Sequence, residues 1–145
     1  MRSVIDSLPT AARVLLGLVF FVFGLNGFLG FLPMPPLSGA AGAFMGGLAA
    51  TGYFFPLLKG TEVLVGVALF SGTLVPLALT VLAPITINIV AFHAFLAPSG
   101  LPIPLAVLAL HLFLAFTYRE ALRGVLALRS EPSRSASLRP SIAAA

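Results

Sequence analysis

Charged residues are almost absent from the middle of this chain of 145 residues. Between Arg13 and Arg119 the only ones are Lys59 and Glu62. Charged residues make up 8% of the chain and hydrophobic residues 59%, whereas an ordinary soluble domain is roughly 25% charged. A soluble domain of this size leaves much of its surface in water and cannot bury so many apolar side chains. The sequence therefore predicts an integral membrane protein, with lipid in place of water around its apolar segments.

The net charge of +4 comes mainly from arginines outside the apolar middle of the chain. Basic residues beside apolar segments are typical of the cytoplasmic flanks of membrane spans, whereas nucleic-acid binding needs a basic face on a folded soluble unit. We therefore expect the lipid bilayer, and no nucleic acid, as a partner. The chain has no cysteine, which excludes disulfides, thiolate metal sites and iron–sulfur clusters. We expect no metal site.

Four apolar segments, separated by turns rich in proline and glycine, predict four membrane-spanning helices. Their ranges are 13–32, 56–71, 76–97 and 103–121. The first is about 20 residues long, enough to cross ~30 Å of hydrocarbon. A secretory signal is the competing interpretation, but the segment exceeds the usual apolar core of roughly 7–15 residues. We expect it to be retained as a span, preceded by a short cytoplasmic lead over residues 1–12.

A segment rich in Ala and Gly between the first two spans predicts one further helix, over residues 39–52. Ser38 can cap its start and Gly52 its end. Because it is too short to span, we expect an interfacial or re-entrant helix that packs through small residues. The predicted fold is therefore all-α, a membrane-embedded four-helix bundle with this additional short helix, in one domain over residues 1–128. The composition of residues 129–145 predicts a disordered cytoplasmic tail.

The distribution of charge predicts the orientation of the spans. Both ends of the chain are basic, and the loops near residues 33–38 and 98–103 carry no charge. Both termini are therefore expected in the cytoplasm, which requires an even number of spans.

This topology places five polar side chains in the outer half of the membrane: Asn26, Glu62, Asn88, His93 and His111. At 1.5 Å per residue, Asn26 and Glu62 lie roughly 9 Å below the outer surface, His111 roughly 10 Å and His93 roughly 6 Å. An ionised side chain at the bilayer centre costs about 2.5–3.5 kcal/mol. We therefore predict a shared polar pocket inside the bundle, open to the outer side.

Each of these side chains also has a simpler interpretation. Lys59 and Glu62 are three residues apart on one helix and can pair with each other. Asn26 lies between glycines and can join two helices by hydrogen bonds. Asn88 follows Pro84 by four residues and can satisfy backbone groups freed by a kink. Each histidine can be a hydrogen-bonded packing residue.

Three stretches of the chain resemble the DoxX family of small bacterial membrane proteins, and the resemblance extends over roughly residues 11–128. They are Gly17–Phe28, Thr51–Glu62 and Leu82–His93. The resemblance implies a four-helix fold in the bacterial inner membrane. It marks as pattern positions Asn26, Lys59, Glu62, Asn88 and His93. The family is named after subunits of a thiosulfate:quinone oxidoreductase, so the resemblance also implies a link to quinone chemistry.

Our first hypothesis is a redox-associated oxidoreductase subunit that binds a quinone or a small lipophilic ligand, with a redox protein or a second copy as partner. Glu62 and His93 are then the candidate catalytic residues, as proton relay and hydrogen-bond donor. The candidate ligand-binding residues are Asn26, Tyr53, Lys59, Asn88 and His111. The second hypothesis is a non-enzymatic structural, assembly or lipid-contact subunit. Haem ligation by the two histidines and a transporter function rank below both.

Overall fold

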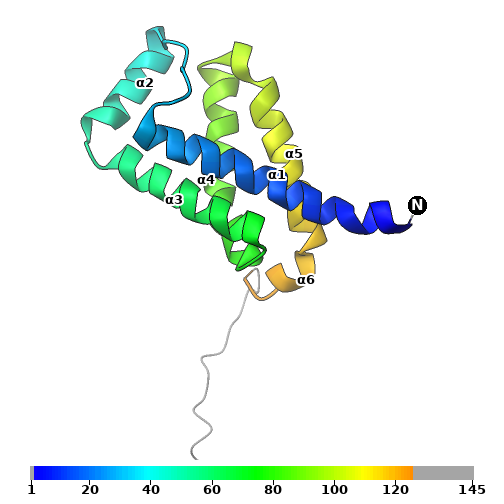
Figure 1. The fold of residues 1–145 in the computed structure, drawn as a ribbon. Helices are drawn as coiled ribbons and strands as arrows, with labels where there is room; N and C mark the ends of the chain where they lie inside the picture. Colours follow the sequence, from blue (N-terminus) through cyan, green and yellow to red (C-terminus); the bar gives the residue numbers. More distant parts are fainter. Residues whose placement is uncertain (1, 126–145) are drawn as a thin grey trace, which may run out of the picture.

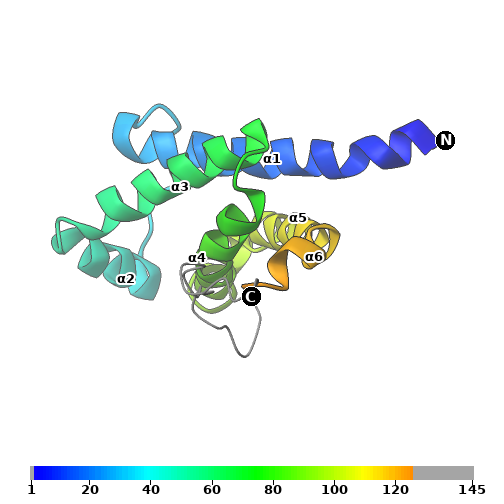
Figure 2. The same ribbon diagram turned by 90° about the horizontal axis from the view of Figure 1, so that it is seen from below.

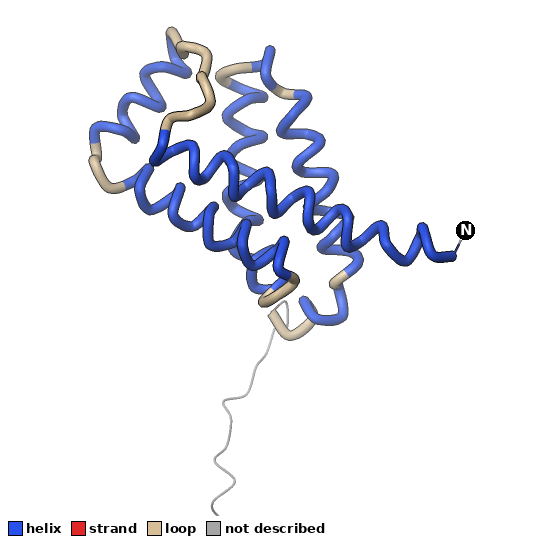
Figure 3. The backbone as a smooth tube through the Cα atoms, viewed as in Figure 1, coloured by secondary structure: helices blue, strands red, loops and turns tan. Residues whose placement is uncertain are grey.

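The computed structural model describes residues 2–125, and these form helices joined by short turns (Figures 1 and 3). The helices are α1 (Arg2–Leu29), α2 (Gly39–Ala50), α3 (Phe54–Ser71), α4 (Val75–Phe95), the 3-10 turn η1 (Pro98–Gly100), α5 (Pro102–Thr117) and α6 (Arg119–Leu122). The described part of the chain contains no strand, which confirms the all-α class. The predicted disordered tail over residues 129–145 lies outside it.

Three helices are long and apolar enough to cross a membrane: Ser7–Leu29 of α1, α3 and α4. They have the length and composition expected of a membrane protein. α2 and α5 are shorter apolar helices. With 16 residues, α5 is about 24 Å long at 1.5 Å per residue.

The helices form two antiparallel pairs that cross each other. α1 lies along α3, and α4 lies along α5 (Figure 1). Seen from below, α1 and α3 form one layer and α4 and α5 another (Figure 2). The first turns of α1 project beyond the other helices, and α2 lies to one side, reached through the long loop of residues 30–38 (Figure 3). The crossing brings apolar side chains of α1, α3, α4 and α5 together.

The core forms where the two pairs meet. Its most buried side chains are Leu16, Phe20, Leu69, Leu79, Leu82 and Leu114. They come from α1, α3, α4 and α5, so the two pairs share one apolar core.

Glycines allow α1 and α3 to pack with their backbones in contact. A Cβ placed on Gly66 would lie 2.6 Å from the backbone nitrogen of Phe21 and 2.8 Å from the carbonyl oxygen of Gly17. A Cβ on Gly24 would lie 2.9 Å from the backbone nitrogen of Val63. Any larger residue would separate the helices, so small residues fix this interface as they do between membrane helices.

α1 differs at both ends from the span predicted over residues 13–32. It begins at Arg2, so the predicted lead of residues 1–12 is largely helical. It ends at Leu29 because Gly30 takes a left-handed conformation, with φ of 62°, which only glycine adopts at little cost. Gly30 therefore ends the helix before the chain reaches Pro33.

The other predicted ranges differ less, with one exception. α2 agrees with residues 39–52, although the Ser38 side chain makes no capping hydrogen bond. α3 starts two residues before Pro56, which the first turn tolerates because its N–H groups have no intrahelical partner. α4 follows the prediction of 76–97 within two residues. The fourth helix, predicted to residue 121, breaks at Tyr118, where α5 ends and α6 begins.

Candidate functional site

The observed helix ends place the polar side chains at different levels along their helices. Glu62 lies about 12 Å from the start of α3, and His111 lies about 14 Å from the start of α5. Both are therefore near the middle of their helices. Asn26 and His93 are only about 3–5 Å from the ends of α1 and α4. The single polar layer expected from the sequence is thus spread over about 11 Å along the helices.

Lys59 and Glu62, both on α3, form an ion pair on the side of the helix that packs against α1. Lys59 Nζ lies 2.8 Å from Glu62 Oε2. The aliphatic part of Lys59 covers Gly27, and Cβ of Glu62 packs beside Gly24. Glu62 is 2% exposed, whereas 23% of the Lys59 side chain is accessible. The pairing predicted from their spacing is confirmed, and it joins a buried carboxylate to an amine that reaches the surface.

The geometry of this pair suits holding the two helices together. Two glycines of α1 leave room for the side chains of α3, so the ion pair sits against the α1 backbone. A buried carboxylate without its cation would be strongly unfavourable. Neither of the two cavities described below is lined by Glu62, and its carboxylate faces the helix interface.

His111 and Thr86 form a second polar pair, between α5 and α4. Thr86 Oγ1 lies 3.0 Å from His111 Nδ1, and both residues are buried. Leu79 and Thr86 are seven residues apart, hence on the same face of α4, and both are buried. The sequence did not single out Thr86 as a candidate residue, although its spacing from Leu79 and Leu82 places it on the buried face of α4.

His93 is bonded to its own helix. Its Nδ1 lies 2.8 Å from the carbonyl oxygen of Ile89. A carbonyl only accepts hydrogen bonds, so Nδ1 carries the proton and donates it. The other edge of the ring packs against Gly100 of η1, where a Cβ would lie 3.2 Å from Nε2. The ring also meets Phe92 edge-on, with centroids 5.3 Å apart.

Asn26 holds the turn after α1. Its Oδ1 accepts a hydrogen bond of 2.6 Å from the backbone N–H of Leu32, and its Nδ2 donates one of 3.4 Å to the carbonyl of the same residue. The amide is therefore used by the chain's own backbone. Tyr53, at the start of α3, is 65% exposed and forms no hydrogen bond through its hydroxyl with the described residues.

Asn88 lies at a cavity of about 260 Å³ between α2 and α4. The cavity is lined by Phe44, Asn88, Ala91, Phe92, Phe95 and Leu96. The rings of Phe44 and Phe92 approach within 5.9 Å between centroids. Asn88 is exposed, and its amide has no hydrogen-bond partner among the described residues. It does not cap the backbone groups freed by Pro84, so it remains available to a ligand.

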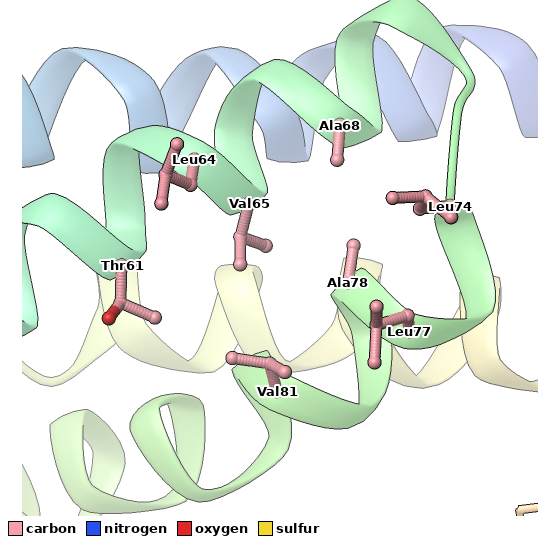
Figure 4. Close-up of a pocket in the computed structure, with 8 residues that line it drawn as sticks. All are labelled: Thr61, Leu64, Val65, Ala68, Leu74, Leu77, Ala78 and Val81. Atoms are coloured by element: carbon pink, nitrogen blue, oxygen red, sulfur yellow. The ribbon is translucent and has the colours of Figure 1, made fainter.

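A second cavity of about 260 Å³ is a groove where α3 and α4 diverge from their connecting turn (Figure 4). We call it the α3–α4 groove. Its walls are Thr61, Leu64, Val65 and Ala68 of α3 and Leu74, Leu77, Ala78 and Val81 of α4. Thr61 donates its hydroxyl proton to the carbonyl of Leu57. The groove therefore offers almost only apolar surface.

Of the candidate site residues, the structure pairs Lys59 with Glu62 and gives the others separate surroundings. No group of three or more His, Cys, Asp or Glu side chains suited to a metal ion occurs among residues 2–125. Comparison with protein-family models, curated proteins and solved structures finds no match to this chain.

Proposed function

We propose that the chain is an integral membrane protein of the DoxX type with four spans, α1, α3, α4 and α5. α5 is shorter than the other three but runs antiparallel to α4 along its length, as a returning span would. The four spans then form two crossed pairs, α1 with α3 and α4 with α5, and not a regular bundle with parallel axes. The membrane is a bacterial inner membrane, as the resemblance implies.

The distribution of charge supports an orientation with both termini in the cytoplasm. Arg13 is bonded to the last turn of α3, and Arg119 and Arg123 follow α5 near the α3–α4 turn (Figure 1). The loops at the opposite end, residues 30–38, 51–53 and 96–101, carry no charge. Because basic residues concentrate on the cytoplasmic side of membrane proteins, the end with the arginines faces the cytoplasm.

Within this protein, the α2–α4 cavity binds a lipophilic ring compound with a hydrogen-bonding oxygen, and a quinone is the first candidate. The observation that carries this proposal is the free amide of Asn88 in a cavity with three phenylalanines. A polar group facing hydrocarbon without a partner is unfavourable. A quinone carbonyl would accept a hydrogen bond from Nδ2 of Asn88, and the phenylalanine rings would flank the quinone ring.

The remaining polar residues act as supports in this proposal. Glu62 and Lys59 hold α3 against α1, and Thr86 and His111 hold α4 against α5. His93 touches the cavity only through Phe92. The chain is then a ligand-binding subunit, and electron transfer belongs to a redox partner.

The second candidate function is a non-enzymatic assembly or lipid-contact subunit. It is favoured by the pairing of Glu62 with Lys59 and of His111 with Thr86. Among the described residues, no buried side-chain nitrogen or oxygen atom lacks a hydrogen-bond partner. Affinity purification in mild detergent discriminates the two. A partner complex that persists in Asn88→Leu, together with absence of ligand binding in the wild type, favours the assembly subunit.

The direct test is equilibrium dialysis of the purified protein against a short-chain quinone such as ubiquinone-1. We expect saturable binding to the wild type. Asn88→Leu should bind about tenfold more weakly, because one hydrogen bond contributes roughly 1–1.5 kcal/mol. Ala91→Phe should block the cavity.

Ile87→Leu is the matched control, since Ile87 is exposed on the same helix and does not line the cavity. Its affinity should equal that of the wild type. The proposal is refuted if the wild type shows no saturable binding. It is also refuted if Asn88→Leu and Ala91→Phe bind the quinone as tightly as the wild type does.

A further inference from the structure

Arg13 lies at the end of α3, next to the mouth of the α3–α4 groove. Its Nη1 donates to the carbonyl of Leu69 and lies 3.5 Å from the carbonyl oxygen of Phe70. The last carbonyls of a helix lack intrahelical partners and carry partial negative charge, so a guanidinium binds them well. The same group rests on Gly72, where a Cβ would be 2.6 Å from Nη1.

The positive charge of Arg13 has no counter-ion among the side chains that the structure describes. The carboxylate of Glu120 pairs instead with Arg119 and Arg123, at 3.8 and 2.7 Å. With the residues that the structure describes, Arg13 forms hydrogen bonds only through Nη1, although a guanidinium has five N–H donors. Arg13 is half-buried, and it can still bind an anion through Nε and Nη2.

The α3–α4 groove begins two residues beyond Gly72, at Leu74. Leu74 takes a left-handed conformation, with φ of 50°, which costs a residue with a Cβ roughly 1–2 kcal/mol. Its side chain, 67% exposed, forms the lip of the groove at the end near the α3–α4 turn (Figure 4). The short side chains of Ala68 and Ala78 leave the space between the helices open.

We propose that the α3–α4 groove binds one acyl chain of an anionic phospholipid, whose phosphate pairs with Arg13. Both walls of the groove belong to helices apolar enough to span a membrane, so acyl chains surround it. The hydroxyl of Thr61 is already bonded within α3, and the lining offers no further polar side chain to a ligand. The described residues that line the groove carry no charge, and Arg13 brings a positive charge to the α3–α4 turn at one end, which matches a lipid with a negative headgroup.

The charges also favour a lipid over a second copy of the chain. A helix from a second copy would have to supply a carboxylate to Arg13. The two carboxylates whose side chains the structure describes, those of Glu62 and Glu120, are already paired with basic side chains. A phospholipid brings the apolar chain and the negative charge together. The site lies at the start of α4 and the α2–α4 cavity lies at its end, so the two proposed sites are separate, although both rest on the proposed membrane-spanning fold.

Native mass spectrometry of the detergent-solubilised chain, titrated with phosphatidylglycerol or phosphatidylcholine of identical acyl chains, tests the proposal. The wild type should bind phosphatidylglycerol at least fivefold more tightly. Arg13→Gln should lose about fivefold in affinity for phosphatidylglycerol alone, as expected for one basic residue near an anionic lipid. Ala78→Leu should weaken the binding of both lipids.

Two further variants separate lipid binding from a role in folding. Arg13→Lys keeps the charge and should keep the preference for phosphatidylglycerol even if α3 is destabilised. Arg119→Gln changes a paired arginine at the same end and should leave the preference unchanged. Equal affinity of the wild type for the two lipids overturns the proposal, as does an equal loss in Arg119→Gln. Ala78→Leu that changes the oligomeric state but not lipid affinity would instead assign the groove to a protein interface.

Discussion

Replacing Gly66 by alanine tests the close packing of α1 against α3. The new Cβ would lie 2.6 Å from the backbone nitrogen of Phe21, about 0.8 Å closer than the 3.4 Å at which ordinary van der Waals contact begins. Backbone atoms cannot rotate away, so the two helices must separate. A gap of 0.5–1 Å removes about a quarter to a half of each dispersion contact that it opens. We expect a loss of about 1–3 kcal/mol in the free energy of unfolding.

The measurement is unfolding by sodium dodecyl sulfate in mixed micelles, followed by far-UV circular dichroism. Gly60→Ala is the matched control, because Gly60 lies on the same helix and a Cβ there would meet nothing within 4 Å. It should be neutral or stabilising by up to about 1 kcal/mol, as alanine favours helix. Gly17→Ala tests the same close packing from α1, because its Cβ would lie 2.9 Å from the carbonyl oxygen of Gly66. The double variant with Gly66→Ala should therefore lose less unfolding free energy than the sum of the two single variants. Equal stabilities of Gly66→Ala and Gly60→Ala would refute the close helix packing.

Three further predictions concern the polar contacts. Thr86→Val should cost about 1 kcal/mol in the same unfolding assay, because it leaves His111 Nδ1 without its partner; unchanged stability would exclude the contact. Lys59→Met should cost up to about 3 kcal/mol, since it leaves Glu62 buried without a cation, and the double variant Lys59→Met/Glu62→Leu should regain most of that loss; a double variant as unstable as the single one would contradict the ion pair. Asn26→Ala should speed hydrogen exchange of the amide of residue 32, measured by mass spectrometry, because the bond from that amide to the asparagine is lost; unaltered exchange would contradict this contact.

Local signals in the sequence predicted the helices well and their ends less well. The bounds of α2 follow from the glycines and prolines around it. The end of α1 was misplaced because Gly30 turns the chain before the prolines do, and the Asn26 side chain holds that turn. The break at Tyr118 was missed because residues 119–122 are all good helix formers and give no local signal of a break. The crossing of the helix pairs depends on contacts between distant segments, which a pattern along one chain does not contain.

The same distinction applies to the site residues. The Lys59–Glu62 pair was predictable, since the partners are three positions apart on one helix. The pairing of His111 with Thr86 joins residues 25 apart, and that of Arg13 with Leu69 joins residues 56 apart. The prediction of one polar pocket assumed that polar groups in hydrocarbon must meet each other. Asn26 and His93 instead bind backbone groups, which are equally available partners.

The membrane topology underlies every proposal made for this protein, and labelling of single cysteines measures it directly. The chain has no cysteine of its own, and Thr73, Ser99 and Gly124 are exposed positions in turns or after the last helix. A membrane-impermeant thiol reagent applied to intact cells should label Ser99→Cys, and should label Thr73→Cys and Gly124→Cys only after lysis. Labelling of Gly124→Cys from the same side as Ser99→Cys would show that α5 does not cross the membrane. Labelling of Thr73→Cys from that side would contradict the crossing of α4, and with it the account of the fold in the membrane.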